Sequence, residues 1–134
     1  MLELTESALV ADFDLVITKM RYLKDKGINF SIDDFGTGYS SLNYIRHLPI
    51  SELKIDKSFI DDIVTSDIEV PIINTILQMA KALGLKVVAE GVETQEQLKY
   101  LHSRGCDVIQ GYYFSKPLDS ESWLQSACSN IVNA

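Results

Sequence analysis

Hydrophobic residues recur along this chain with two different spacings. Short apolar or alternating runs are typical of β-strands, and they occur at 2–5, 28–32, 53–55, 86–90 and 107–110. Between these runs, apolar positions three and four residues apart indicate helices. The predicted helices cover 7–26, 40–48, 67–83, 94–104 and a final stretch from about 119, and 57–66 is predicted to be a short helix or turn. Thr94 and Gln97 have the spacing of a capping box. The broad apolar face expected for the helix over 67–83 consists of Ile72, Ile73, Ile76, Met79, Ala80 and Leu83. Strands therefore alternate with helices along most of the chain.

Glycine punctuates this pattern at the helix ends. Gly27, Gly84 and Gly105 each stand where a helix C-terminus favours a left-handed residue. Short connections between alternating strands and helices favour parallel strands joined by right-handed crossovers. The sequence thus predicts an α/β fold of one domain, with about five parallel strands. Residues 129–134 are expected to form a frayed tail.

Polar side chains stand at or beside the ends of all five predicted strands. In parallel α/β folds the C-terminal strand ends meet at one edge, where function collects. A solvated turn explains any one of these residues alone, but their repetition on every strand favours a shared site. The residues are Glu3, Asp33, Asp34, Lys54, Glu90 and Gln110.

The chemistry of these residues favours a hard metal ion. Four carboxylates with one ammonium suit Mg²⁺ or Mn²⁺ rather than zinc, because no Cys or His lies near a predicted strand end. Adjacent aspartates with glutamates from neighbouring strands can bridge a metal pair, which binds a phosphodiester and acidifies a water. Lys54 can orient that water, or it can serve as a counter-ion to the acidic ring. Both roles stay open.

Composition excludes several other classes of protein. A net charge of −7 over 134 residues argues against sequence-independent binding to a nucleic-acid polymer. No apolar run is long enough to cross a bilayer, and the first residues lack a secretory signal, so we expect a cytoplasmic protein. Cys106 and Cys128 provide neither a disulfide framework nor metal-site spacing. His47 and His102 fall at predicted surface positions of helices and are expected to be solvated.

Five stretches of the chain stand out as motifs that follow one another in order. These stretches are Glu3-Leu4-Thr5-Glu6-Ser7, Asp33-Asp34-Phe35-Gly36-Thr37-Gly38-Tyr39-Ser40-Ser41, Leu53-Lys54-Ile55-Asp56, Ala89-Glu90-Gly91-Val92-Glu93-Thr94 and Gln110-Gly111-Tyr112-Tyr113-Phe114-Ser115-Lys116-Pro117. Together they closely resemble the successive motifs of one bacterial family, the EAL domain. EAL domains are phosphodiesterases that linearise the second messenger cyclic di-GMP to pGpG. The resemblance implies a TIM-type barrel with one antiparallel strand and a two-metal site that uses Mg²⁺ or Mn²⁺.

The resemblance also assigns roles by position. It implies metal ligands at Glu3, Asp33, Asp34 and Glu90, of which Glu90 is also catalytic together with Lys54, the residue that contacts the catalytic water. It implies pocket residues at Gln110, Glu93 and Asp56, the last beside the lysine. It further implies that Glu6 holds the loop from Phe35 to Ser41, which the family uses to couple metal and substrate binding to dimerisation.

The chain departs from the family in length. A full barrel needs about 250 residues, whereas this chain begins near the family's fourth strand and lacks the Glu-Ala-Leu glutamate and an asparagine ligand. We therefore expect residues 1–128 to be the C-terminal part of an EAL-type barrel, a partial barrel that is weakly active or inactive alone. The alternative is a non-catalytic cyclic di-GMP-binding or regulatory module.

An open barrel also bears on assembly. Its edge strands and interior side chains would be exposed, which favours a homodimer or higher oligomer that covers them. Pairing through the helical face around residues 40–75 is the alternative.

Overall fold

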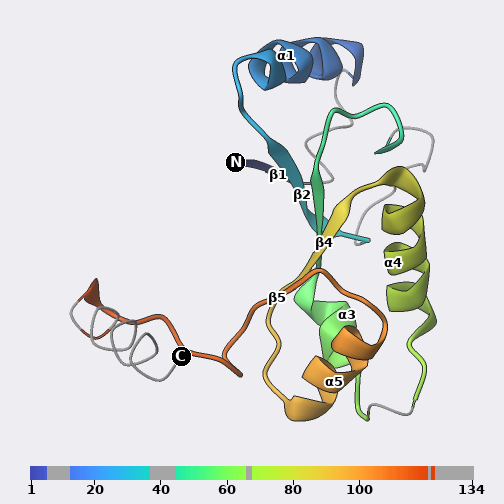
Figure 1. Ribbon diagram of the computed structural model, residues 1–134, viewed down its shortest axis with the longest axis vertical. Helices are drawn as coiled ribbons and strands as arrows, with labels where there is room; N and C mark the ends of the chain where they lie inside the picture. The colour runs from blue at the N-terminus through green and yellow to red at the C-terminus, as the bar shows by residue number, and fades with distance from the viewer. Residues whose placement is uncertain (6–12, 37–44, 66–67, 121, 123–134) are drawn as a thin grey trace.

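Five strands lie side by side in sequence order and form one parallel sheet (Figure 1). The computed structural model describes residues 1–5, 13–36, 45–65, 68–120 and 122. The strands are β1 (Leu2–Thr5), β2 (Phe30–Phe35), β3 (Glu52–Ile55), β4 (Lys86–Ala89) and β5 (Val108–Ile109). Each pairs with the next in parallel, so the predicted α/β fold is confirmed.

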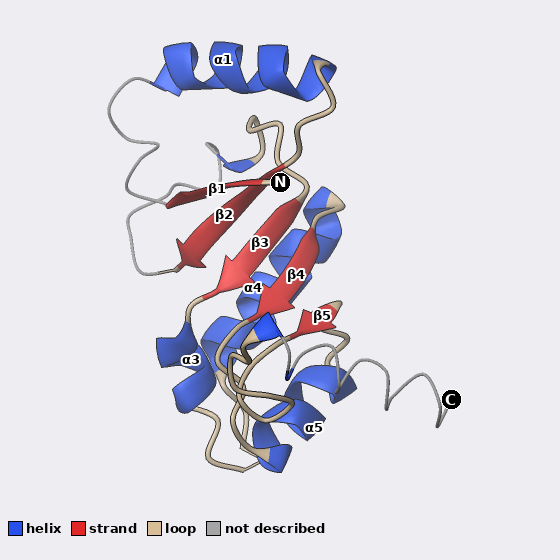
Figure 2. Cartoon of the chain, turned by 90° about the vertical axis from the view of Figure 1, so that its left-hand side faces the viewer, coloured by secondary structure: helices blue, strands red, loops and turns tan. Residues whose placement is uncertain are grey.

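Four helices connect the strands within the described part of the chain. They are α1 (Phe13–Asp25), α3 (Lys57–Asp61), α4 (Pro71–Leu83) and α5 (Gln95–Ser103). The arrows of β2, β3 and β4 point toward the end where α3 and α5 lie, and α4 runs behind one face of the sheet (Figure 2). No described helix lies in front of the other face (Figure 2). The sheet therefore has one covered face and one open face.

Strand pairing sorts the side chains between these two faces. Because successive residues of a strand point to opposite faces, residues paired across the sheet share a face. The paired row of Leu4, Ile32, Leu53 and Val87 is apolar and faces the helices. The neighbouring row of Glu3, Ser31, Glu52 and Lys86 lies on the open face. This alternation gives the sheet an apolar side and a polar side.

Helix α4 supplies much of the cover on the apolar side. Its buried residues recur at helical spacing: Ile73, Ile76, Leu77 and Ala80. Ile72 was also expected on this face, but its side chain is 38% exposed, so that prediction is wrong. Pro71 occupies the first turn, where its missing N–H leaves no helical hydrogen bond unmade. Gly84 ends the helix with φ +69°, as its position predicted.

Several element boundaries differ from the prediction. Helix α3 ends at Asp61 rather than at 66, and strands β4 and β5 are shorter than predicted. Strand β2 begins at Phe30 rather than Ile28 and continues through both aspartates to Phe35. The backbone N–H of Ile28 instead bonds to the carbonyl of Leu23, which closes the end of α1. Helix α4 begins at Pro71 rather than 67, so it has no acidic residue in its first turn.

Some expectations fall outside the described residues. These are the start of the first predicted helix, most of the helix predicted over 40–48, nearly all of the final helix, the tail at 129–134 and the position of Glu6. All five described strands are parallel, so the antiparallel strand implied by the resemblance is not among them. Within the described residues, no helix combines the length and apolar character that crossing a membrane requires.

Candidate active site

The ammonium of Lys54 lies at the centre of a carboxylate ring. Its Nζ is 2.8 Å from Glu3 Oε1, 2.7 Å from Glu90 Oε1 and 3.7 Å from Asp33 Oδ1. These residues come from β1, β2, β3 and the end of β4, at the C-terminal edge of the sheet. Only 11% of the Lys54 side chain is exposed. The structure thus brings together charged residues that lie far apart in the sequence.

Asp33 and Asp34 reach this edge through an irregularity in β2. In a regular strand two adjacent side chains point to opposite faces. The pairing of β2 with β3 shifts register between Ile32 and Phe35, and Asp34 has φ +53°. The Asp34 N–H bonds to Asp33 Oδ1 at 3.1 Å, and its side chain is hydrogen-bonded to that of Asp56. The bulge therefore brings Asp34, near the end of β2, next to Asp56, which follows β3.

Glu90 is held on a second side by Gln110. The Gln110 side-chain Nε2 donates to Glu90 Oε1 at 2.7 Å. The backbone carbonyl of Gln110 accepts from the N–H of Val92 at 3.1 Å. Gly111 fits only because it lacks a side chain, since a Cβ would lie 2.2 Å from the Val92 backbone. A hollow of about 590 Å³ adjoins these groups and is lined by Glu90, Glu93 and Gln110 among others. The predicted pocket residues Glu93 and Gln110 thus border one cavity with Glu90.

Asp56 lies directly after β3, at the start of helix α3. It caps helix α3, because its Oδ1 accepts from the N–H of Ser58 at 2.9 Å and from the Ser58 hydroxyl. These Ser58 hydrogen bonds, with a further one to Asp34, lower the pKa of Asp56. Asp56 therefore bonds to Ser58 and Asp34 and lies two residues along the chain from Lys54.

Electrostatics fix the protonation state of the central lysine. Burial alone would lower the pKa of Lys54, but hydrogen bonds to Glu3 and Glu90 and the charge of Asp33 raise it above its ordinary value. Lys54 is consequently an ammonium at neutral pH. Partial withdrawal from water and the charges of Asp33 and Asp56 raise the pKa of Asp34.

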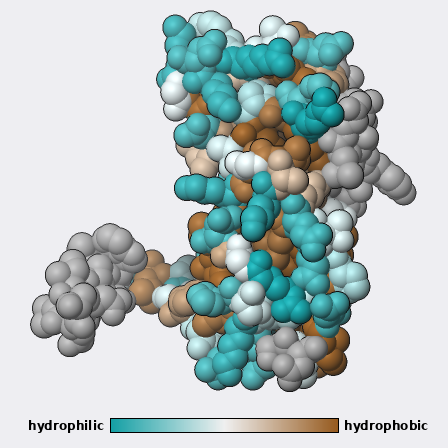
Figure 3. All heavy atoms as spheres, turned by 45° about the vertical axis from the view of Figure 1, so that its right-hand side comes forward, coloured by the Kyte–Doolittle hydropathy of each residue, from teal (hydrophilic) through white to brown (hydrophobic). Residues whose placement is uncertain are grey.

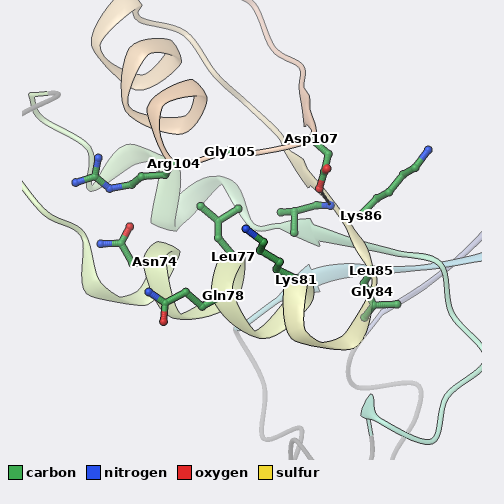
Figure 4. A pocket seen from close by; sticks show the side chains of 11 residues that line it. Asn74, Leu77, Gln78, Lys81, Gly84, Leu85, Lys86, Arg104, Gly105 and Asp107 are labelled. Carbon is green, nitrogen blue, oxygen red and sulfur yellow. Dashed lines mark hydrogen bonds between the residues drawn. The ribbon is translucent and has the colours of Figure 1, made fainter.

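A second hollow, of about 640 Å³, lies at the other end of β4 (Figure 4). Residues of α4, the start of β4 and the turn before β5 line it, and none of the predicted site residues does. The side chains of Arg104 and Lys86 extend in opposite directions there (Figure 4). Arg104 stacks on the Tyr100 ring at 4.0 Å and pairs with Glu69. This hollow is remote from the convergent carboxylates, so the candidate site is the C-terminal edge.

The donor chemistry of that edge fits a hard divalent cation. Carboxylate oxygens are the ligands that Mg²⁺ and Mn²⁺ prefer. However, the described residues contain no group of three or more acidic, His or Cys side chains arranged to hold a metal, because Glu3, Asp33 and Glu90 turn toward Lys54 instead. The ligand types fit a metal, and the three carboxylates of the ring are paired with the Lys54 ammonium.

Comparison with known proteins decides the family. The model of the EAL domain family matches residues 1–117. The chain belongs to the EAL domain family. The matched residues include all of the predicted site residues, and they account for most of the chain.

Individual EAL proteins resemble the chain closely. It is 52% identical over 117 residues to the cyclic di-GMP phosphodiesterase NbdA of Pseudomonas aeruginosa, covering 87% of this chain and 15% of that protein. The solved PaMucR phosphodiesterase, in complex with c-di-GMP, is 43% identical and superimposes with a TM-score of 0.82 over 90% of this chain and 49% of that one. A manganese and cyclic di-GMP complex of Klebsiella pneumoniae BlrP1 is 36% identical, with a TM-score of 0.76 over 86% and 29%.

These matches also show how much of each relative's length the chain covers. It spans less than a fifth of NbdA and about half of the solved PaMucR chain. Manganese in a related structure supports the use of a divalent metal in the family. The five parallel strands alternating with helices correspond to part of the TIM-like barrel of EAL domains.

Sequence reasoning missed three residues near the site. Lys57 pairs with Asp61 at 2.8 Å and with Glu93 at 3.3 Å, and its side chain lies against Gly91. Ser31 is fully buried on the polar row, and its hydroxyl has no hydrogen-bond partner among the described residues. Gln97 is buried beneath the loop that carries Glu93. Of these, only Gln97 had a visible signal, the capping box that it forms with Thr94.

Proposed function

We propose that this chain forms the C-terminal part of a cyclic di-GMP phosphodiesterase domain. The observation that carries the proposal is the carboxylate ring around Lys54 at the C-terminal strand edge. Its identity with NbdA, a cyclic di-GMP phosphodiesterase, supports the same chemistry. In the reaction, one water adds across one phosphodiester bond of the cyclic dinucleotide and yields linear pGpG.

The residues divide between metal binding and charge neutralisation. Glu3, Asp33, Asp34 and Glu90 would hold Mg²⁺ or Mn²⁺, and the Klebsiella manganese complex supports the second ion. When bound, such a metal acidifies a water and neutralises phosphodiester oxygens. Loss of a ligand would weaken both effects.

Lys54 acts as a hydrogen-bond donor rather than a general base. Because its pKa lies above the ordinary lysine value, Nζ keeps all three protons at neutral pH. It can donate to the attacking water or to a phosphodiester oxygen, and its charge offsets the negative charge that develops on phosphorus. Gln110 fixes one oxygen of Glu90 by its 2.7 Å hydrogen bond. The hollow beside them has room for part of a nucleotide.

A chimeric domain tests this proposal. Residues 1–117 would replace the matching stretch of the PaMucR domain, which is 43% identical. We expect conversion of cyclic di-GMP to pGpG in Mn²⁺, measured by chromatography, and a loss of at least 100-fold in Lys54→Met and Glu90→Gln. Lys81→Met, in the remote hollow, is the control and should leave turnover unchanged.

The chimera also separates catalysis from binding alone. Cyclic di-GMP bound without turnover would refute catalysis and support the regulatory alternative. The 134-residue chain assayed by itself is expected to hydrolyse cyclic di-GMP weakly or not at all. Because cyclic di-GMP is a bacterial second messenger, we also propose that the domain acts in the cytoplasm.

The two edge strands of the sheet support a second part of the proposal, self-association. Leu2 on β1 and Val108 on β5 are 46% and 42% exposed, and these strands form the two edges of the sheet. On the α4 side of the molecule, which Figure 3 brings forward, hydrophobic surface is also visible among polar residues. Pairing of edges between copies would satisfy exposed backbone groups and cover apolar surface. Sedimentation at micromolar concentration should detect a dimer or larger species, and a stable monomer would refute self-association.

A further inference from the structure

Gln97 is a buried amide whose oxygen and nitrogen both make hydrogen bonds. Only 5% of the residue is exposed. Its Oε1 accepts from the N–H of Glu93 at 2.8 Å and from that of Thr94 at 3.1 Å, and its Nε2 donates to the carbonyl of Ile60 at 3.2 Å. A buried polar side chain with three backbone partners is costly to replace, because each partner would lose its hydrogen bond.

These partners belong to two segments that carry site residues. Ile60 lies in α3, which follows β3 and its Lys54 almost directly. Glu93 and Thr94 lie in the loop that follows β4 and begins at Glu90. Gln97 therefore ties the segment after Lys54 to the segment after Glu90.

A second polar link between these segments is weaker. The ion pair of Lys57 with Glu93 spans 3.3 Å, and both side chains are 46% exposed. Exposed ion pairs contribute only about 0–1 kcal/mol because water and salt screen them. The Gln97 hydrogen bonds are withdrawn from water, so they constrain the loop more strongly.

We propose that Gln97 is a positioning residue, which holds Glu90 within reach of Lys54 and Gln110 by fixing the loop from Glu90 to Thr94 against α3. The inference rests on the proposed function in one respect, that Glu90 is the group positioned for catalysis. Gln97 touches neither ring nor hollow. Gln97 would act on Glu90 through the backbone that joins Glu90 to Thr94.

The decisive test compares two variants of buried polar residues on α5. Gln97→Met keeps the size of the side chain and removes all three hydrogen bonds. Tyr100→Phe is the matched control, because Tyr100 is fully buried and accepts from the Val70 N–H at 2.8 Å without touching the loop. Both should lose stability, but only Gln97→Met should disturb Glu90.

Nuclear magnetic resonance of the 134-residue chain reads this disturbance directly. The side-chain NH₂ of Gln110 donates to Glu90, so its shifts should move in Gln97→Met toward those of a Glu90→Ala reference. Exchange of the Glu93 and Thr94 amides should quicken at least tenfold in the same variant. Tyr100→Phe should leave all of these signals in place. Unchanged Gln110 shifts in folded Gln97→Met would overturn the proposal.

A second variant covers the case in which Gln97→Met does not fold. Gln97→Glu keeps the acceptor for the Glu93 and Thr94 amides, but its carboxylate cannot donate to Ile60. We expect those two amides to stay slow while the Gln110 shifts move, and unmoved shifts would again refute positioning. These readouts need no substrate, so failure of turnover in the chimera would count against the proposed function alone.

Discussion

Replacement of Lys54 by methionine tests the carboxylate ring most directly. The substitution keeps an unbranched side chain of similar length and removes the ammonium from between Glu3, Asp33 and Glu90. Two short hydrogen bonds, of 2.7 and 2.8 Å, are lost, and three carboxylates are left facing one another. We expect the variant to be less stable than the parent chain in metal-free buffer.

The magnitude follows from the exposure of the partners. A hydrogen bond to a charged group contributes about 1.5–3 kcal/mol when buried. Glu3 is 52% exposed and Glu90 is 27% exposed, so hydration replaces part of each bond, and about 2 kcal/mol in total is a reasonable net loss. For a chain of this length, that loss lowers the melting temperature by roughly 6–10 °C.

Thermal unfolding in EDTA, followed by circular dichroism, measures this loss. Lys86→Met is the control, because Lys86 is an exposed lysine on the same sheet face and should change stability by less than about 0.5 kcal/mol. Because the pKa of Lys54 is raised, its stabilisation is fully present below the ordinary lysine pKa of 10.5 and is lost as the pH rises beyond it. The difference between parent and variant should therefore be constant from pH 7 to 9 and shrink above 10.5.

Manganese provides the second half of this test. Without a competing ammonium, the carboxylates of Lys54→Met are free to turn toward a cation, and Mn²⁺ at 100 times its dissociation constant adds about 2.7 kcal/mol. The variant should thus gain more from Mn²⁺ than the parent does. A variant that melts with the parent in EDTA would show that the ring contributes nothing to folding.

Three further predictions concern the scaffold. Gly111→Ala should lower the free energy of unfolding in urea by at least about 3 kcal/mol, because the new Cβ would lie 2.2 Å from the Val92 backbone. Gly84→Ala, which has open space around it, should lower it by only about 1 kcal/mol, and equal losses would contradict this reasoning. Ile73→Ala, at a fully buried site, should cost about 3–4 kcal/mol in the same assay and Ile72→Ala under 1, and the reverse order would show that α4 is rotated. Burial raises the pKa of Cys106 from 9.0 to about 11, so stability should fall as the pH rises from 9 to 11. In a Cys128→Ser background, iodoacetamide at pH 8 should label Cys106 slowly until denaturant is added, and fast labelling of the folded chain would contradict burial.

Local signals explain what the sequence predicted correctly. The strand at 2–5, the glycine at the end of α4 and the capping box of Thr94 each depend on residues within a few positions of one another. The convergence of Glu3 and Glu90 on Lys54 followed from a general property of parallel strands, which place their C-terminal ends at one edge.

Features that depend on distant partners were not predictable in this way. Aspartate is unfavourable in strands, yet β2 continues through Asp33 and Asp34 because Phe35 pairs with Ile55 on β3. The buried face of α4 was assigned too broadly, since two adjacent isoleucines both fit an apolar pattern and only packing selects Ile73. The contact of Gln97 with Ile60 spans 37 residues and leaves no local trace.

The left-handed backbone of Asp34 makes this residue unfavourable for stability, although it is a predicted residue of the site. A side chain at φ +53° is strained, and glycine or asparagine would occupy that position with less cost. Partial withdrawal from water and the charges of Asp33 and Asp56 raise the pKa of Asp34, and removing its carboxylate would relieve the repulsion from Asp33. The hydrogen bond to Asp56 is lost in Asp34→Gly, whereas an asparagine amide can still donate to Asp56. Asp34→Gly or Asp34→Asn should therefore fold as well as the parent chain or better. Selection of variants for thermal tolerance alone would therefore remove Asp34 and break up the adjacent pair of carboxylates that it forms with Asp33.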